Sequence, residues 1–121
     1  MSDAVGPVAA DPVNPHAPLF SDCFALCEWL LGRLGSDPNV LAVRTCHAAL
    51  ALLESLTLAL KGRNRDAQLE AADEALISLR VLLRLCGSTG LLTQQQMLYV
   101  LTASEPIGRQ LGGWLRAIGP V

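Results

Sequence analysis

The sequence predicts an all-α protein built as an antiparallel, up-down bundle of four helices. Leu and Ala recur throughout the 121 residues, whereas aromatic residues make up only 4% of them, a balance that favours helices over strands. Apolar residues recur at spacings of three and four in four successive segments, as they do on one face of a helix. The connections between these segments are short, which favours antiparallel neighbours. The composition argues against an all-β fold.

The chain divides into a tail and one domain. Residues 1–18 carry four prolines among small and polar residues, with no apolar periodicity. We therefore expect a flexible Pro-rich N-terminal tail at 1–18 and a four-helix bundle at 19–121. The formal net charge of −2 comes from two acids in the tail, so the expected bundle is formally neutral. The chain lacks the strongly basic balance that is typical of non-specific nucleic-acid binders.

The cysteine pattern and the apolar runs bear on the compartment. The four cysteines have no CxxC spacing, and no signal-peptide pattern is present, so we expect a reducing, cytoplasmic environment. The longest uncharged stretch, residues 85–104, contains two glycines and three consecutive glutamines. These residues are costly in hydrocarbon, so we expect no membrane span.

The first two helices are predicted at about residues 20–34 and 39–60. Ser21 or Asp22 is available to cap the first, and the sequence Gly-Ser-Asp-Pro at 35–38 ends it. The second helix carries two adjacent apolar seams, which are Ala42, Ala49, Leu52, Leu56 and Ala59, and Val43, Cys46, Leu50, Leu53 and Leu60. A face this wide serves two neighbours, the rest of the bundle and another subunit.

The third and fourth helices follow a basic loop at 61–65. Asp66 is expected to cap the third helix, whose apolar rhythm runs from Leu69 to Cys86 and ends at Gly87. A capping box of Thr93 and Gln96 opens the fourth helix. Its apolar stripe consists of Met97, Leu101, Ile107, Leu111, Trp114 and Ile118, and the sequence Gly-Pro at 119–120 ends it. Pro106 lies inside this helix, removes one backbone hydrogen bond to Thr102 and should kink the axis.

Catalytic and metal-binding signatures are absent from the sequence. No phosphate-binding glycine loop, nucleophile elbow or HExxH motif occurs, so we expect no catalytic residue and no cofactor. His47 has no acid or second ligand one turn away, which favours a structural role. Cys23 and Cys27 share one helical face, and a tetrahedral metal site with Cys46 or His47 is the alternative to core packing. Apolar neighbours and the lack of a polar second shell favour core packing and no metal.

Positive charge gathers in residues 75–121. The residues after Glu74 include only one acid, Glu105, but four arginines, which are Arg80, Arg84, Arg109 and Arg116. Arg80 and Arg84 share a helical face, as do Arg109 and Arg116, so antiparallel packing of the last two helices would join them into one stripe. Arginine forks suit phosphate. The alternative is a solvated surface with salt bridges to Glu70, Asp73, Glu74 or Glu105. The loop adds the cations Lys61, Arg63 and Arg65.

Small residues recur on the last helix. Ser104, Gly108 and Gly112 are four residues apart, and Gly113 and Trp114 follow. Each helical glycine costs about 0.5–1 kcal/mol relative to alanine, so a compensating contact is expected. Small residues at this spacing let another backbone approach, and a Trp is suited to anchor the contact. The approaching helix belongs either to the same bundle or to another subunit.

A family resemblance rests on the order of three segments. Residues 72–85 end in Leu-Arg-Val-Leu-Leu-Arg-Leu, Leu92 and Thr93 open the next helix, and residues 107–115 read Ile-Gly-Arg-Gln-Leu-Gly-Gly-Trp-Leu. In this order they resemble the accessory variability proteins (Avd) of diversity-generating retroelements, a four-helix-bundle family. The related proteins encoded within ribosomal RNA intervening sequences are similar as well. The resemblance covers about residues 19–118.

The resemblance implies a function without catalysis. It implies a homopentameric barrel that binds the element's reverse transcriptase and contacts template RNA, DNA or an RNA/DNA hybrid through a positive surface. Such a protein supports mutagenic reverse transcription, in which cDNA of a template repeat replaces a variable repeat in a target gene. The alternative from the same fold is an oligomeric helical interaction module of the intervening-sequence type, with no retroelement partner. A small metal or redox protein is a third alternative.

The resemblance also implies roles for single residues. Arg80, Arg84 and Arg109 fall in the matching motifs and are candidates for the nucleic-acid or reverse-transcriptase surface. Further candidates, on charge alone, are Arg116, Lys61, Arg63 and Arg65. The candidates for fold or assembly are Gly108, Gly112, Gly113 and Trp114. The sequence departs from the family pattern in two ways, because Avd proteins are commonly basic and because Pro106 stands before the Ile-Gly-Arg motif.

Overall fold

The computed structural model describes residues 17–118 and contains four helices in that range and no strand. The helices are α1 (Ala17–Leu34), α2 (Val40–Leu60), α3 (Arg65–Thr89) and α4 (Gln94–Ile118). The prediction of an all-α four-helix bundle is confirmed. Residues 1–16 of the predicted tail and residues 119–121, with the predicted Gly-Pro end, lie outside the described residues.

The start of α1 differs from the prediction. The helix begins at Ala17 instead of Phe20, so the last two residues of the predicted tail are helical. Pro18 is tolerated there because the N–H groups of a first helical turn have no helical partner. Ser21 and Asp22 consequently lie inside α1 and cap nothing. At the start of α2, by contrast, the side-chain oxygen of Asn39 accepts a hydrogen bond from the backbone N–H of Leu41 at 2.8 Å.

Both ends of α3 also differ from the prediction. Its N-cap is Asn64, which adopts a left-handed conformation (φ 50°) without a side-chain capping bond. Asp66 lies in the first turn, where the positive end of the helix dipole favours a carboxylate. At the other end α3 continues past Gly87 to Thr89, and Gly90 takes the left-handed conformation (φ 83°) that ends many helices.

The start of α4 confirms the predicted capping box. The backbone N–H of Thr93 donates to Oε1 of Gln96, and the backbone N–H of Gln96 donates to Oγ1 of Thr93, both at 3.0 Å. The helix then runs unbroken through Pro106. The amide of Gln110 donates to the carbonyl of Pro106 at 3.1 Å and to the carboxylate of Asp22 at 3.3 Å, which ties α4 to α1.

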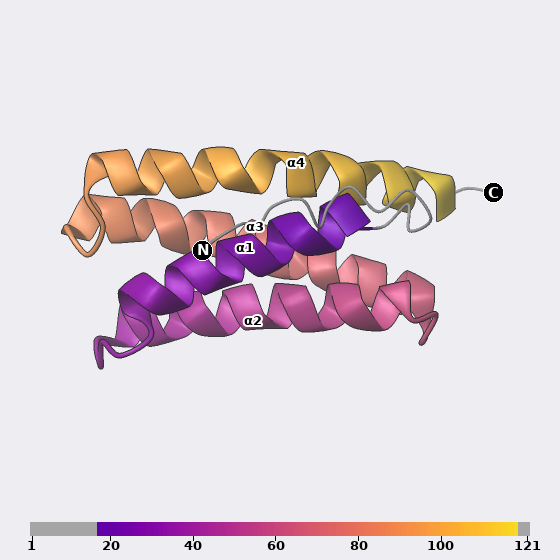
Figure 1. Ribbon diagram of the computed structural model, residues 1–121, viewed down its shortest axis with the longest axis horizontal. Helices are drawn as coiled ribbons and strands as arrows, with labels where there is room; N and C mark the ends of the chain where they lie inside the picture. Colours follow the sequence, from indigo (N-terminus) through magenta and orange to yellow (C-terminus); the bar gives the residue numbers. More distant parts are fainter. Residues whose placement is uncertain (1–16, 119–121) are drawn as a thin grey trace, which may run out of the picture.

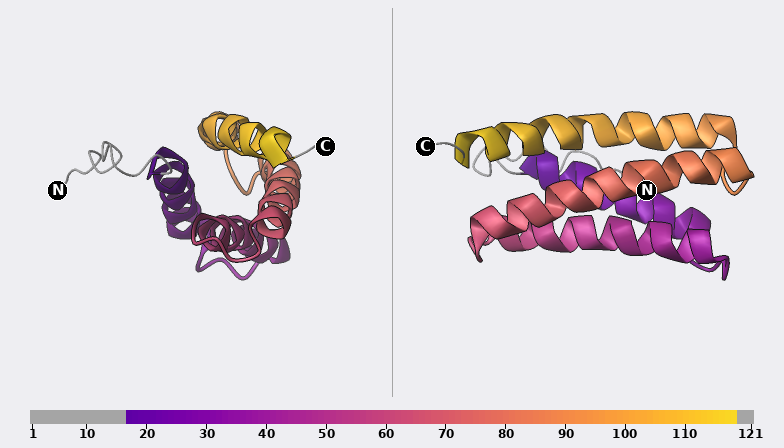
Figure 2. Two further views of the ribbon diagram at one scale, coloured as in Figure 1. Left: turned by 90° about the vertical axis from the view of Figure 1, so that its right-hand side faces the viewer. Right: turned by 180° about the vertical axis from the view of Figure 1, so that it is seen from behind.

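The four helices surround one core, and each packs against two neighbours. Contacts join α1 to α2, α2 to α3, α3 to α4, and α4 back to α1, and the view along the bundle in Figure 2 shows this order. In Figure 1 the α1–α2 and α3–α4 turns lie at one end of the molecule. The α2–α3 turn lies at the opposite end, together with the last turns of α4. This arrangement sets the motif-bearing helices α3 and α4 side by side.

Leucine side chains from every helix fill the interior. The largest buried ones include Leu30, Leu52, Leu79, Leu83 and Leu111. On α2 the first predicted seam (Ala42, Ala49, Leu52, Leu56 and Ala59) is buried, whereas most of the second is not. Cys46 of that second seam joins the core, but Val43 is exposed and the other members are half-buried.

Helix α2 is long and apolar, a combination that the sequence analysis did not detect because it considered only residues 85–104 as a possible membrane span. By length and composition Val40–Leu60 is apolar enough to cross a membrane. In this structure, however, its buried seam packs into the bundle between α1 and α3. Core helices pass the same test of length and composition, so packing accounts for the apolar character of this seam.

Candidate functional site

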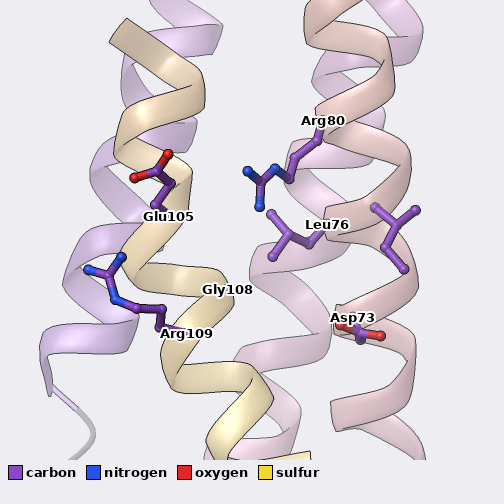
Figure 3. Close-up of a pocket in the computed structure, with 7 residues that line it drawn as sticks. Asp73, Leu76, Arg80, Glu105, Gly108 and Arg109 are labelled. Atoms are coloured by element: carbon purple, nitrogen blue, oxygen red, sulfur yellow. The ribbon is translucent and has the colours of Figure 1, made fainter. Parts of the chain in front are cut away.

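Two of the predicted arginines meet at the junction of α3 and α4. Arg80 extends from α3 toward α4, and Glu105 and Arg109 stand on successive turns of α4 (Figure 3). They border an open hollow of about 370 Å³. Its lining consists of Asp73, Leu76, Ile77, Arg80, Glu105, Gly108 and Arg109. The hollow therefore combines residues from the first and the third of the segments that carry the family resemblance.

The hollow is electrically balanced. Asp73 and Glu105 contribute two carboxylates beside the guanidinium groups of Arg80 and Arg109. Within residues 17–118, however, no ion pair at 4.0 Å or less involves Arg80, Arg84, Arg109 or Arg116. The salt-bridged surface considered as an alternative is therefore not formed. The guanidinium groups keep their hydrogen-bonding capacity for an external anion, which the two nearby carboxylates oppose.

The remaining predicted cations do not line the hollow. Arg84 is exposed one turn farther along α3. Lys61 and Arg63 are exposed in the α2–α3 turn, and Arg116 is exposed on the last turns of α4 at the same end of the bundle. Arg65, predicted in the loop, is instead the first residue of α3. The seven candidates therefore fall into three groups. Arg80 and Arg109 border the hollow, and Arg84 lies one turn away on α3. The end of the bundle with the α2–α3 turn, called the basic end, carries Lys61, Arg63, Arg65 and Arg116.

The predicted small residues of α4 fall into different surroundings. Ser104 is fully buried. A Cβ added to Gly108 would lie 3.5 Å from Cδ2 of Leu76 and 3.7 Å from Nη1 of Arg80, so this glycine faces α3 and has room for a methyl group. A Cβ on Gly112 or Gly113 would meet only the guanidinium of Arg116, at 3.5 and 3.9 Å. Within residues 17–118, no atom of another helix lies within 4 Å of a Cβ placed on either glycine.

An exposed apolar strip on α3 was missed by the sequence analysis. Ile77, Val81 and Leu85 are 58%, 61% and 47% exposed. They lie four residues apart and therefore share one helical face. This spacing is visible in the sequence. The sequence analysis, however, recognised only the core stripe through Leu76, Leu79 and Leu83 and did not identify the exposed residues as a second stripe.

An aromatic surface between α1 and α4 was also missed. The rings of Trp29 and Tyr99 lie 5.5 Å apart, and the guanidinium of Arg33 lies over Trp29 at 5.1 Å from the ring centroid. Three shallow hollows of about 360, 250 and 220 Å³ all border Trp29. Nothing in the sequence pattern joins two aromatic residues 70 positions apart, so only the packing of α1 against α4 reveals this surface.

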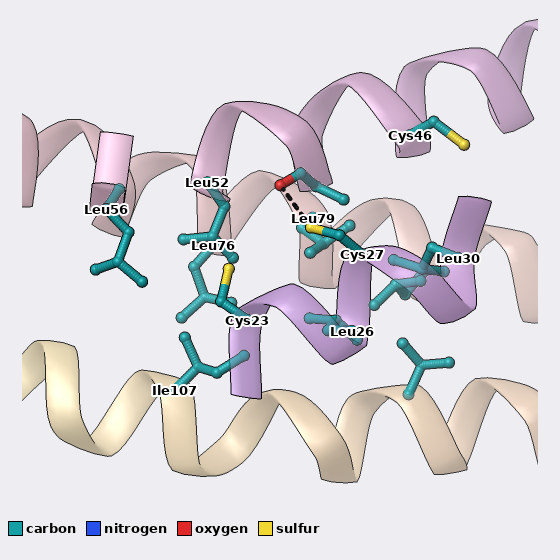
Figure 4. Packing of buried hydrophobic residues seen from close by; sticks show 14 of the residues in the cluster. Cys23, Leu26, Cys27, Leu30, Cys46, Leu52, Leu56, Leu76, Leu79 and Ile107 are labelled. Carbon is teal, nitrogen blue, oxygen red and sulfur yellow. Dashed lines mark hydrogen bonds between the residues drawn. The ribbon is translucent and has the colours of Figure 1, made fainter. Parts of the chain in front are cut away.

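All four cysteines are buried in the core, and Figure 4 shows Cys23, Cys27 and Cys46 there. The thiol of Cys27 donates to the carbonyl of Ala49 at 3.2 Å, and Cys86 lies 3.5 Å from the hydroxyl of Thr45. A hydrogen bond with Cys27, together with burial, raises the pKa of the Cys23 thiol. Burial also raises the pKa of the thiols of Cys46 and Cys86.

The described residues do not form the metal site that was the alternative to core packing of the cysteines. Among the described residues, no group of three or more His, Cys, Asp or Glu side chains is placed to hold a metal ion. His47 is exposed on α2. A raised pKa keeps the thiols of Cys23, Cys46 and Cys86 protonated and therefore poor ligands and poor nucleophiles. The hydrogen bond with Cys23 lowers the pKa of the Cys27 thiol instead.

Comparison of the chain with models of protein families, with curated proteins and with solved structures gave no match. The function is accordingly argued from the surfaces described above and from the sequence motifs that they contain.

Proposed function

We propose that this protein is a non-enzymatic accessory protein of a diversity-generating retroelement. It binds the element's reverse transcriptase and template RNA or cDNA, and it supports mutagenic reverse transcription. The observation that carries the proposal is that two of the motif segments, residues 72–85 and residues 107–115, lie against each other. Arg80 of the first and Arg109 of the second border one hollow, and Gly108 faces Leu76 of α3.

We propose that the bundle is antiparallel and that five copies assemble into a ring in the cytoplasm. The positions of the three connecting turns support the antiparallel arrangement. Two features support assembly. A Cβ on Gly112 or Gly113 would have no atom of another helix within 4 Å among residues 17–118, and Val43 of the second α2 seam is exposed. A ring would repeat Arg80 and Arg109 around one axis, and repetition strengthens binding to a polyanion.

The decisive experiment is co-purification with a reverse transcriptase encoded beside this chain. Light scattering gives the mass of the complex, and the absorbance ratio gives its nucleic-acid content. We expect a ring of this chain with one enzyme and RNA. The double variant Arg80→Ala/Arg84→Ala should weaken the complex without unfolding the bundle. Arg44→Ala is the matched control, because Arg44 is exposed on α2 and does not line the hollow.

Two results would count against the proposal. Unchanged binding of the double variant to both enzyme and RNA would remove Arg80 and Arg84 from the binding surface. A clean oligomer of the wild-type chain that ignores enzyme and RNA would exclude the accessory role.

The second candidate is an oligomeric interaction module of the ribosomal RNA intervening-sequence type, with no retroelement partner. It is favoured by the balanced charge of the hollow, where Asp73 and Glu105 oppose the binding of phosphate. Gene neighbourhood separates the two candidates, because a reverse-transcriptase gene and paired repeats are expected only beside a retroelement accessory protein.

A further inference from the structure

The outer face of the second half of α3 carries exposed apolar side chains that no other part of residues 17–118 covers. Ile77, Val81 and Leu85 (the α3 strip) cover two helical turns, about 12 Å along the axis. Each side chain is about half exposed or more, and none belongs to the buried core. A continuous exposed apolar stripe on a helix is typical of a surface that another element covers.

Positive charge lies beside the α3 strip on the second half of its own helix. Arg80 and Arg84 lie on the same half of α3, and no acidic residue occurs between Glu74 and Glu105. The first half of α3 is acidic instead, with Asp66, Glu70, Asp73 and Glu74. Arg80 and Arg84 therefore place positive charge beside Val81 and Leu85, whereas Asp73 and Glu105 line the hollow together with Ile77.

The hollow between α3 and α4 lies beside the α3 strip and offers a place for an anchoring side chain. Ile77 is both a member of the α3 strip and part of the lining of the hollow between α3 and α4. With a volume of about 370 Å³, the hollow is large enough for one bulky apolar side chain. Leu76 and Gly108 give it an apolar floor. Anchoring side chains that fill such hollows carry much of the energy of helix-in-groove binding.

We propose that the α3 strip docks an amphipathic helix of a partner protein, whose apolar stripe covers Ile77, Val81 and Leu85 and whose acidic side chains face Arg80 and Arg84. The four-residue spacing of the strip matches the spacing of anchors along one helix face. Three apolar side chains offer nothing to a phosphate backbone, which favours a protein over a nucleic acid. The inference concerns the chemistry of the docked segment and stands whether or not the partner is a reverse transcriptase.

The test uses the full chain and a fluorescent helical peptide of about four turns, with leucine along one face and glutamate on both flanks. Fluorescence anisotropy measures its binding. We expect Val81→Ser and Arg84→Glu each to weaken binding by about tenfold or more. A second peptide, with lysine in place of glutamate, should bind weakly to the wild-type chain and more tightly to Arg84→Glu.

The controls use exposed residues outside the α3 strip. Leu98→Ser removes an exposed apolar side chain of α4, and Arg44→Glu reverses an exposed charge of α2, so both should bind the glutamate peptide like the wild type. Circular dichroism establishes that every variant is folded.

Three outcomes would overturn the proposal. Equal binding of the two peptides would show that charge plays no part, and unchanged binding of Val81→Ser would show that the strip plays none. A fall in particle mass on Val81→Ser, measured by light scattering, would assign the strip to a second copy of the chain. Binding of the glutamate peptide without co-purification of a reverse transcriptase would support this inference and contradict the proposed function.

Discussion

The guanidinium of Arg65, on the first residue of α3, lies over the indole ring of Trp114 on α4, with its Cζ atom 5.2 Å from the ring centroid. The contact joins the start of one helix to the last turns of another at the basic end of the bundle. From the sequence, Arg65 was a candidate for binding and Trp114 a candidate for assembly. In the folded chain each contacts the other within one subunit.

This cation–π contact predicts a measurable coupling. Arg65→Ala should lower the free energy of unfolding by about 0.5–1 kcal/mol, because the contact is partly exposed to solvent. In a Trp114→Leu background, which keeps an apolar side chain but removes the aromatic face, the same change should have almost no effect. Urea denaturation of the four proteins in this double-mutant cycle measures the coupling. Arg63→Ala is the control, and equal losses in both backgrounds would show that the ring contributes nothing.

Two glycines should respond to alanine in opposite directions. Gly90 has φ +83°, a left-handed conformation in which a Cβ is strained, so Gly90→Ala should destabilise the protein by about 1 kcal/mol. Gly32 is exposed inside α1 with no atom within 4 Å of an added Cβ, so Gly32→Ala should stabilise it by up to about 1 kcal/mol. Chemical denaturation of both variants checks the sign. A Gly90→Ala protein as stable as the wild type would contradict the assigned cap.

The parts of the fold that the sequence predicted are those set by local rules. The number of helices, the core stripe of α3 and the capping box of Thr93 and Gln96 follow from spacing and short-range hydrogen bonds. The ends of α3 were less predictable. Asp66 and Gly87 look like end signals, but Asn64 and Gly90 adopt the left-handed conformations that bound the helix, and several nearby residues can fill such positions.

The surface was harder to predict than the core, because it depends on which helices become neighbours. Arg80 and Arg109 were expected on one face, and they border one hollow. The charge balance of that hollow depends on Asp73, which lies on the same α3 face, and this was anticipated only as part of the salt-bridged alternative. The pairing of Trp29 with Tyr99 requires the packing of α1 on α4, for which the sequence holds no local signal.

Gly112 separates a role in folding from a role in assembly. A Cβ at this position would contact only the side chain of Arg116, so Gly112→Ala should leave the single chain as stable or stabilise it by up to about 1 kcal/mol. If another subunit packs its backbone on this glycine, the same substitution should weaken the oligomer. Light scattering across a dilution series, beside chemical denaturation, measures both quantities. An unchanged oligomer would exclude Gly112 from the subunit interface.

The buried thiols predict how stability depends on pH. Below about pH 8.5, cysteines are protonated in both the folded and the unfolded chain. The hydrogen bond with Cys23 lowers the pKa of Cys27, which acts in the opposite direction. Above that pH, however, the unfolded chain releases thiol protons that the folded chain retains at three positions, because a hydrogen bond and burial raise the pKa of Cys23 and burial raises that of Cys46 and Cys86. The free energy of unfolding should therefore fall as pH rises, by about 1.4 kcal/mol per pH unit for each such thiol at full effect.

Urea denaturation between about pH 7.5 and 9.5, with a reductant present, measures this slope. The Cys86→Ala variant removes one of the three thiols, so its stability should fall less steeply than that of the wild type over the same range. A thiol reagent should in turn modify the native protein slowly and the urea-unfolded chain at once, because the thiolate is the reactive form. A wild-type slope equal to that of Cys86→Ala would show that the Cys86 thiol ionises alike in the folded and unfolded chain, contrary to its burial beside Thr45.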